Sequence, residues 1–140
     1  MTHYVVGFLF TAQRKSVVLV EKQRPEWQRG KLNGVGGKVE TEEGILQAMR
    51  REFLEETGVD IPDWTGFAVL SGEGFQIHFF YACGVAARKV ASPTDEVVRL
   101  YRLSELASLP LIPNARWLIP MALSMEADRA ASFLIQEIAA

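Results

Sequence analysis

Acidic side chains gather in one short stretch of this 140-residue chain. Four charges stand within six residues and a glycine follows: Arg51, Glu52, Glu55, Glu56 and Gly58. If the stretch is helical, its three glutamates share one face, because residues three and four positions apart are neighbours on a helix. Like charges on one face repel, and anions near a helix C-terminus oppose the helix dipole. The cluster therefore favours a bound cation that offsets this repulsion.

Carboxylates grouped in this way suit a hard divalent cation. Mg²⁺ prefers oxygen ligands and usually binds through a few carboxylates together with substrate phosphates. Arg51 precedes Glu55 by four residues, which is close enough on a helix to orient that carboxylate through charge-assisted hydrogen bonds. The alternative interpretation is a solvent-exposed acidic helix face, which is what most runs of charge are.

The wider segment Gly37–Val59 resembles the signature motif of the Nudix hydrolases. It follows the pattern Gly, five residues, Glu, seven residues, and then Arg-Glu-apolar-any-Glu-Glu-any-Gly-apolar, without a gap. The matching positions are Gly37, Glu43, Arg51, Glu52, Phe53, Glu55, Glu56, Gly58 and Val59. Phe53 stands where the family more often has an aliphatic residue, but the position stays apolar. Such a spaced match is far more specific than the acidic cluster alone.

The resemblance implies an α/β protein with the Nudix fold, a mixed β-sheet sandwiched between α-helices. It also implies metal ligands, namely the carbonyl of Gly36 and the carboxylates of Glu52, Glu55 and Glu56. Glu96 is a further candidate, since MutT-like members often place an extra metal-binding glutamate at the entrance to a strand. An exposed charge at a strand edge is the alternative for Glu96. The metal implied is Mg²⁺, with Mn²⁺ as the second choice.

The reaction implied is attack of water on a phosphorus atom of a nucleoside diphosphate derivative. Metal ions neutralise the phosphate oxygens in such a reaction, and a carboxylate accepts the proton of the water. Glu55, Glu56 and Glu96 are equal candidates for this base. Arg51 and Glu52 complete the expected catalytic set. Glu43 matches the early glutamate of the motif, and structural support of the loop is an equal alternative for it.

Polar residues outside the acidic cluster are candidates for holding the nucleotide. Lys38, directly after the motif glycine, and Arg24, in the preceding loop, are expected to bind phosphate, because a point charge suits it. Asn33 and the pair Pro113-Asn114 resemble positions at which MutT-type enzymes contact the purine base. An amide donates and accepts side by side, as a purine edge requires. A turn at Asn33 and helix capping by Asn114 are the alternatives.

These residues predict a MutT-like, Mg²⁺-dependent nucleoside triphosphate pyrophosphohydrolase. Its expected substrate is a purine dNTP, including oxidised forms such as 8-oxo-dGTP, cleaved to the monophosphate and pyrophosphate. The alternatives are another nucleoside diphosphate derivative (ADP-ribose or a dinucleoside polyphosphate) and a non-catalytic Nudix-fold nucleotide-binding module. All four motif carboxylates are present, which argues against the module. An isomerase of the same fold needs metal-binding histidines and a catalytic cysteine, for which one Cys and two His are thin support.

Composition predicts one soluble globular domain over residues 1–140. The net charge is −2 and no basic block occurs, so nucleic-acid binding has no electrostatic basis. No apolar run approaches the roughly 20 residues that span a bilayer, and the first residues lack the features of a signal peptide. We therefore expect a cytoplasmic monomer or homodimer that binds a small nucleotide and neither nucleic acid nor membrane. Cys83, the single cysteine, is expected in the core.

The first half of the chain predicts a hairpin, a loop and a helix. Tyr4–Phe10 and Ser16–Glu21 are apolar at nearly every position, which indicates paired strands covered on both faces. The segment Lys22–Leu32 is polar and indicates a loop. A helix is expected from an N-cap at Thr41 to about Thr57, ended by Gly58 in the left-handed conformation. Its apolar stripe should pack on a sheet and consists of Ile45, Leu46, Met49 and Phe53.

The remaining chain predicts mostly strands. They are expected over Lys38–Glu40, Thr65–Leu70, Phe75–Val85 and Glu96–Arg102. Ser104 caps a short helical turn, and a longer helix starts at Pro113, within which Pro120 predicts a kink or a boundary. The last apolar run, Ala131–Ile138, is ambiguous, and its Phe and Ile content favours a strand over a helix.

Overall fold

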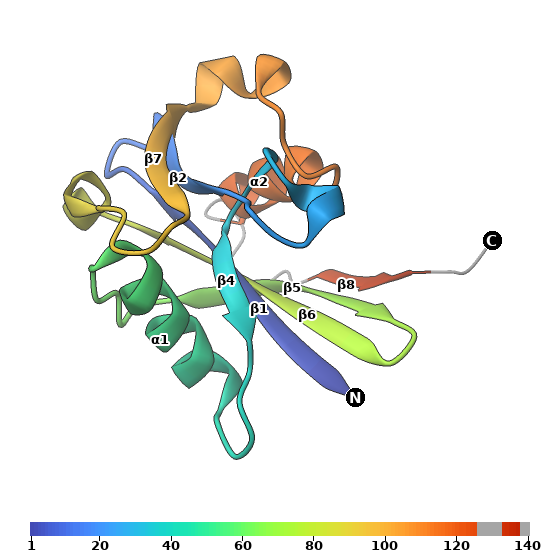
Figure 1. Ribbon diagram of the computed structural model, residues 1–140. Coiled ribbons are helices and arrows are strands. Elements are labelled where there is room, and N and C mark those ends of the chain that lie inside the picture. Colours follow the sequence, from blue (N-terminus) through green and yellow to red (C-terminus); the bar gives the residue numbers. More distant parts are fainter. Residues whose placement is uncertain (126–132, 138–140) are drawn as a thin grey trace.

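The computed structural model describes residues 1–125 and 133–137, in which a mixed sheet carries a helix on each face (Figure 1). The strands are β1 (Thr2–Phe10), β2 (Ser16–Glu21), β3 (Leu32–Asn33), β4 (Val35–Lys38), β5 (Thr65–Gly72), β6 (Phe75–Cys83), β7 (Val97–Arg102) and β8 (Phe133–Gln136). The α-helices are α1 (Ile45–Thr57) and α2 (Ala115–Ser124), and the 3-10 turns are η1 (Glu26–Gln28), η2 (Val85–Lys89) and η3 (Leu103–Ser108).

Strand β1 lies at the centre of the sheet. On one side it pairs in parallel with β6 along its whole length. On the other side its end pairs with β2 and its start pairs with β4, both antiparallel. The hairpin predicted between Tyr4–Phe10 and Ser16–Glu21 is therefore confirmed. Strands β5 and β8 continue the sheet beyond β6, while β3 and β7 pair with β2. This arrangement places the glycine-rich strand β4 directly beside β1.

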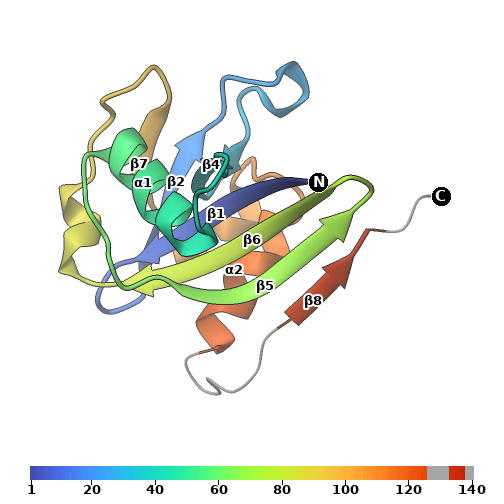
Figure 2. The same ribbon diagram turned by 90° about the horizontal axis from the view of Figure 1, so that it is seen from below.

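Apolar side chains fill both faces of the sheet, which confirms the α/β sandwich. One face packs against α1 through Met49 and Phe53, which are fully buried. The opposite face packs against α2 through Leu118 and Ile119, also fully buried, and Figure 2 shows the two helices on either side of the strands. Strands β1 and β2 are apolar at most positions because both of their faces are covered.

Helix α1 begins later than the sequence indicates. Thr41 was the expected N-cap, but Glu42 adopts a left-handed φ of 67°, so the backbone turns before the helix starts. The observed N-cap is Gly44, and the helix begins at Ile45. The Oε1 atom of Gln47 accepts a hydrogen bond from the Gly44 N–H at 3.3 Å. The segment before the helix is therefore a loop that packs back on it.

The C-terminal end of α1 agrees with the prediction. Gly58 has a φ of 77° and donates its N–H to the Leu54 carbonyl at 2.9 Å. This is the expected left-handed cap. Within the apolar stripe, Leu46 is the exception, because it is 50% exposed, whereas Ala48 on the neighbouring face is fully buried.

Several other predicted boundaries move in the structure. The strand expected over Lys38–Glu40 lies at Val35–Lys38, because the glycines themselves pair with β1. Strand β6 stops at Cys83, which is exposed rather than in the core. Helix α2 continues through Pro120, so of the two alternatives predicted there the boundary is wrong and the kink stays a prediction.

The C-terminal prediction is confirmed where the structure describes it. Phe133–Gln136 is a strand that pairs in parallel with β5, and the rest of Ala131–Ile138 lies outside the described residues except for Glu137. In the described part of the chain, no helix has the length and apolar character needed to cross a membrane.

The packing of α1 on the sheet makes a stability prediction. Phe53 is fully buried and meets Trp64 edge-on, with ring centroids 5.1 Å apart. Phe53→Ala should lower the free energy of unfolding by about 3–5 kcal/mol, because it leaves a cavity. Leu54→Ala is the matched control, since Leu54 is the next residue on the helix and is 45% exposed. Its loss should stay below about 1 kcal/mol in urea denaturation, and equal losses would contradict the described packing.

Candidate active site

Arg51 is the centre of the polar network on α1. Its Nε and Nη2 atoms donate to the two carboxylate oxygens of Glu43 at 2.6 and 2.9 Å. Its Nη1 atom donates to Glu52 at 3.0 Å and to Glu55 at 3.3 Å. Nη2 also donates to the backbone carbonyl of Lys38 at 3.1 Å. One guanidinium therefore ties the helix to the end of β4 and to the loop between them.

Burial and Arg51 together set the charge states of these carboxylates. The Glu43 side chain is 8% exposed, and its hydrogen bonds from Arg51 hold its pKa below the usual range. The Glu52 side chain is 13% exposed, and burial raises its pKa although Arg51 acts in the opposite direction. Glu55 is 57% exposed and faces solvent. Glu43 is thus fully engaged by Arg51, which fits the structural role, while Glu52 and Glu55 keep free oxygen lone pairs.

Two glycines allow β4 to lie against both α1 and β1. A Cβ atom on Gly37 would stand 2.5 Å from Cδ of Glu52. A Cβ atom on Gly36 would stand 1.8 Å from the carbonyl oxygen of Val5. At Gly36 the clash is with backbone, so this position requires glycine, whereas a side chain at Gly37 would displace the Glu52 carboxylate. The absence of a side chain at Gly37 lets the Glu52 carboxylate lie directly against the strand.

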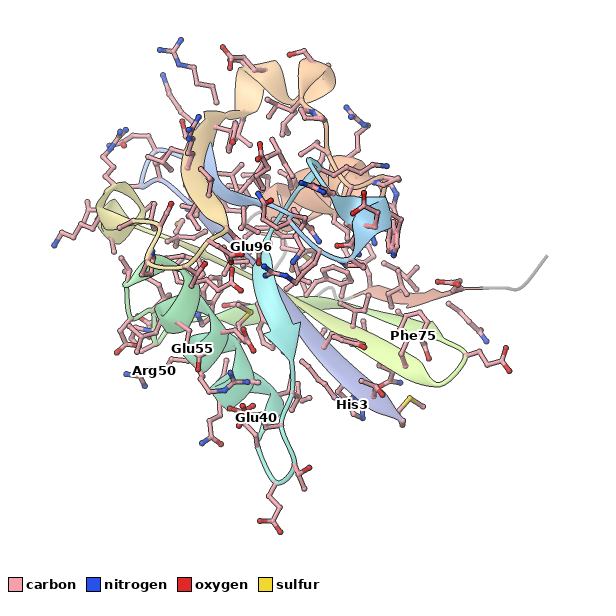
Figure 3. The ribbon with its side chains drawn as sticks, in the orientation of Figure 1. His3, Glu40, Arg50, Glu55, Phe75 and Glu96 are labelled. Carbon is pink, nitrogen blue, oxygen red and sulfur yellow. The ribbon has the colours of Figure 1, made fainter. Side chains whose placement is uncertain are left out.

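Glu56 and Glu96 form a second acidic group. Glu96 precedes β7, is only 6% exposed, and accepts a hydrogen bond from the Gln23 N–H at 3.1 Å. Among the described residues, the buried Oε2 atom of Glu56 has no hydrogen-bond partner. Burial, followed by the charge of Glu96, raises the pKa of Glu56 to about 7. The electrostatic interaction of Glu56 with Glu96 joins side chains 40 residues apart in the chain. Figure 3 labels Glu96 and, on α1, Glu55.

These groups fit a divalent cation better than they fit solvent alone. A buried carboxylate oxygen without a partner and a repelling pair of carboxylates are both relieved by a bound cation. Glu52, Glu56 and Glu96 are coupled electrostatically in the structure. Over residues 1–125 and 133–137, no three aspartate, glutamate, histidine or cysteine side chains form a group that could hold a metal ion by themselves. Substrate phosphates commonly supply ligands to Mg²⁺ in addition to a few carboxylates.

A cleft of about 760 Å³ adjoins the glycine segment. Its lining combines polar and apolar groups, among them Lys22, Trp27, Asn33, Gly36, Gly37, Lys38, Phe75, Phe79 and Asn114. Asn33 and Asn114 reach the same cleft because Leu32 forms backbone hydrogen bonds with the segment before α2. The Leu32 N–H donates to the Pro110 carbonyl at 2.8 Å, and the Ile112 N–H donates to the Leu32 carbonyl at 2.9 Å.

The two predicted base-contacting asparagines both line this cleft. Asn33 is the last residue of β3 rather than a turn residue, and its Oδ1 atom accepts a hydrogen bond from the Gly34 N–H at 2.8 Å. Asn114 occupies the N-cap position of α2 but makes no side-chain capping bond. Its amide is therefore not committed to capping.

Of the two predicted phosphate-binding residues, Arg24 is the one that the structure does not bring to the cleft. It forms an ion pair with Asp95, both side chains are 64% exposed, and neither lines the cleft. Its pKa is raised, chiefly by the hydrogen bond to Asp95. Lys38, by contrast, is exposed and lines the cleft, and its role in phosphate binding stays a prediction.

The sequence interpretation missed Lys22 and Trp27. Trp27 is 66% exposed at the cleft, and a tryptophan in an otherwise polar loop was the available signal. Lys22 follows β2 directly and has no signal in the sequence, because its importance depends on the distant Glu96. His78 lies away from the cleft, where its Nε2 atom is 3.1 Å from Nδ1 of His3.

The chain matches the family model described as NUDIX domain over residues 1–122. The oxidized purine nucleoside triphosphate hydrolase of Danio rerio is 50% identical over 60 residues, a match that spans 43% of this chain and 38% of that protein's length.

Two solved structures illustrate the likeness of fold. A MutT structure from a study of Aliivibrio salmonicida and Vibrio cholerae has a TM-score of 0.75 at 21% identity, with 89% of this chain and 98% of that chain covered. The NUDIX domain of Shewanella oneidensis NrtR complexed with ADP ribose has a TM-score of 0.73 at 20% identity, with 89% and 87% covered. Because the family model covers most of the sequence and the fold agrees, the chain belongs to the Nudix hydrolase family.

Proposed function

We propose that this protein is a MutT-like, Mg²⁺-dependent pyrophosphohydrolase that cleaves a purine dNTP, including oxidised forms such as 8-oxo-dGTP, to the monophosphate and pyrophosphate. The observation that carries the proposal is the shared cleft. It brings Asn33 and Asn114 together with Lys38 and with the glycine backbone that adjoins Glu52. Glu52, Glu55, Glu56 and Glu96 do not line the cleft themselves, but the Glu52 carboxylate lies against Gly37, which does. The proposed site therefore joins amides and a lysine in the cleft to carboxylates at its border.

The lining of the cleft supports a purine as the base. Phe75 and Phe79 supply apolar surface, and Trp27 supplies an exposed aromatic ring. Aromatic rings stack on bases, and amides pair with the O6 and N7 edge of a purine. The name of the Danio rerio relative points in the same direction. ADP-ribose is the second candidate, because the similarly folded NrtR domain is complexed with it.

We assign the carboxylates of the site to metal binding and proton transfer. Glu52, Glu55, Glu56 and Glu96, with the carbonyl of Gly36, would hold the divalent cation. The chemistry that such a cation supplies is neutralisation of the phosphate oxygens and a lower pKa for the attacking water. Glu56 is the proton acceptor that we favour, because burial, followed by the charge of Glu96, raises its pKa to about 7.

Arg51 and Lys38 have supporting roles in this proposal. Arg51 orients Glu52 and Glu55 through its hydrogen bonds and does not line the cleft. Lys38 places a positive charge at the cleft, where it would bind a phosphate oxygen.

A substrate panel tests the proposed reaction. With Mg²⁺, purine dNTPs and 8-oxo-dGTP should release pyrophosphate, and chelation by EDTA should abolish the release.

Glu56→Gln should lower kcat by at least about 100-fold, because it removes the proton acceptor without changing the size of the side chain. Glu105→Gln, an exposed carboxylate on η3, is the matched control and should keep full activity. Turnover confined to ADP-ribose or dinucleoside polyphosphates would overturn the substrate assignment.

The raised pKa of Glu56 predicts how stability depends on pH in the metal-free protein. A carboxyl group whose pKa rises from 4.5 to about 7 on folding binds more protons in the folded state than in the unfolded state. Its contribution to the free energy of unfolding is therefore largest below pH 4.5 and is lost as the pH rises through about 7. In EDTA, Glu56→Gln should therefore have a higher melting temperature than the wild type at about pH 8, and the difference between the two proteins should be smaller at about pH 5. Mg²⁺ should raise the wild-type melting temperature more than that of Glu56→Gln. Parallel melting curves for both proteins across this pH range would contradict the prediction.

Asn114 predicts the discrimination between nucleotides. Asn114→Ala removes an amide that makes no capping bond, so the fold should be retained. The ratio of kcat/KM for 8-oxo-dGTP over that for a pyrimidine dNTP should fall by about 10- to 100-fold, the value of a bidentate base contact. The turnover of the pyrimidine dNTP in the same variant is the internal control. An unchanged ratio would exclude Asn114 from base recognition.

A further inference from the structure

Lys22 lies where the Glu56–Glu96 pair meets the cleft. Its backbone is held on both sides, since its N–H donates to the Lys31 carbonyl and its carbonyl accepts from the Gly30 N–H, both at 2.8 Å. The side chain is only 19% exposed, and its Nζ atom lies 3.5 Å from Oε2 of Glu96. Lys22 also lines the cleft of about 760 Å³. The same ammonium therefore borders both the acidic group and the space proposed for the nucleotide.

The Lys22 ammonium offsets negative charge that is otherwise poorly compensated. Glu56 interacts unfavourably with Glu96 and favourably with Lys22. Arg24 also interacts with these two carboxylates, but it is exposed and forms an ion pair with Asp95. Exposed charges are screened by solvent, so Lys22 has the stronger effect on the pair.

A divalent cation at Glu56 and Glu96 would compete with Lys22. Both carry positive charge and both are attracted by the same carboxylate oxygens, so the binding of one disfavours the other. The phosphates of a nucleotide in the adjoining cleft would offer the ammonium another anionic partner. A lysine suits such an exchange, because its flexible stem carries a point charge that needs no fixed orientation.

We propose that Lys22 couples metal binding to nucleotide binding. In the nucleotide-free protein its ammonium neutralises Glu96 and Glu56, and when a nucleotide enters the cleft it turns to the phosphates and leaves the carboxylates to Mg²⁺. Nucleotide then raises the affinity for Mg²⁺, and by linkage Mg²⁺ raises the affinity for nucleotide by the same factor. Lys22 is a positioning residue in this scheme. The inference rests on the proposed function, since it requires a phosphate-bearing ligand and a divalent cation.

Calorimetric titration of Mg²⁺ tests this coupling without any turnover. Wild type, Lys22→Met, Lys22→Arg and Lys89→Met are each titrated without nucleotide and with a non-hydrolysable purine dNTP analogue. Lys22→Met should bind Mg²⁺ about 5- to 20-fold more tightly without nucleotide, and the analogue should enhance its Mg²⁺ affinity less than it does in the wild type. Lys22→Arg keeps the charge and should stay close to the wild type.

Lys89→Met is the matched control, because Lys89 is exposed on η2 and does not line the cleft. It removes the same charge at a remote position and should leave both affinities unchanged. Melting curves of all variants establish that they are folded. Unchanged or weaker Mg²⁺ binding by Lys22→Met overturns the inference alone, if the wild type binds Mg²⁺ and hydrolyses a dNTP. A wild type that binds no Mg²⁺ and hydrolyses no nucleotide overturns the proposed function, and this inference with it.

Discussion

The hydrogen bonds of one guanidinium, that of Arg51, hold the candidate site together. They bind two carboxylates on its own helix, a third in the loop before it, and a carbonyl at the end of β4. Hydrogen bonds to charged groups are each worth about 1.5–3 kcal/mol, and Arg51 is only 23% exposed. The glycine at position 37 makes this docking feasible, since any side chain there would displace Glu52. The helix, the loop and the strand thus depend on the same contact.

The fold shifts the pKa values of Glu43 and Glu56, on either side of Arg51, in opposite directions. Glu43 is buried but paired, so its pKa falls and its charge is stable. Glu56 is buried beside Glu96 without a hydrogen-bond partner for one oxygen among the described residues, so its pKa rises. Carboxylates left uncompensated in this way disfavour the metal-free folded state, and sites of function commonly carry such a penalty. The contrast separates a carboxylate that builds the site from those that would act in it.

The cleft is assembled from segments that are far apart in the chain. The central position of β1 sets its floor, because β1 pairs with β6 on one side and with the glycine strand β4 on the other. The short strand β3 then bonds to the segment before α2 and brings Asn33 and Asn114 to one cleft. The residues next to each asparagine in the sequence do not account for the position of both asparagines in one cleft. The nucleotide specificity proposed here therefore depends on long-range backbone pairing rather than on the motif.

The sequence by itself determined what local patterns can encode. The hairpin, the α1 helix with its Gly58 cap, the acidic face and the Nudix motif all follow from residue types at short spacing, because helix and strand periodicity are local properties. Its errors were local as well: the left-handed Glu42 moved the helix start from Thr41, and Leu46 and Cys83 are exposed although apolar. Only the tertiary structure decided that Arg24 is engaged by Asp95 and that Lys22 contacts Glu96. Those contacts join residues more than 70 positions apart, and their formation depends on which strands pair, which no short stretch of sequence specifies.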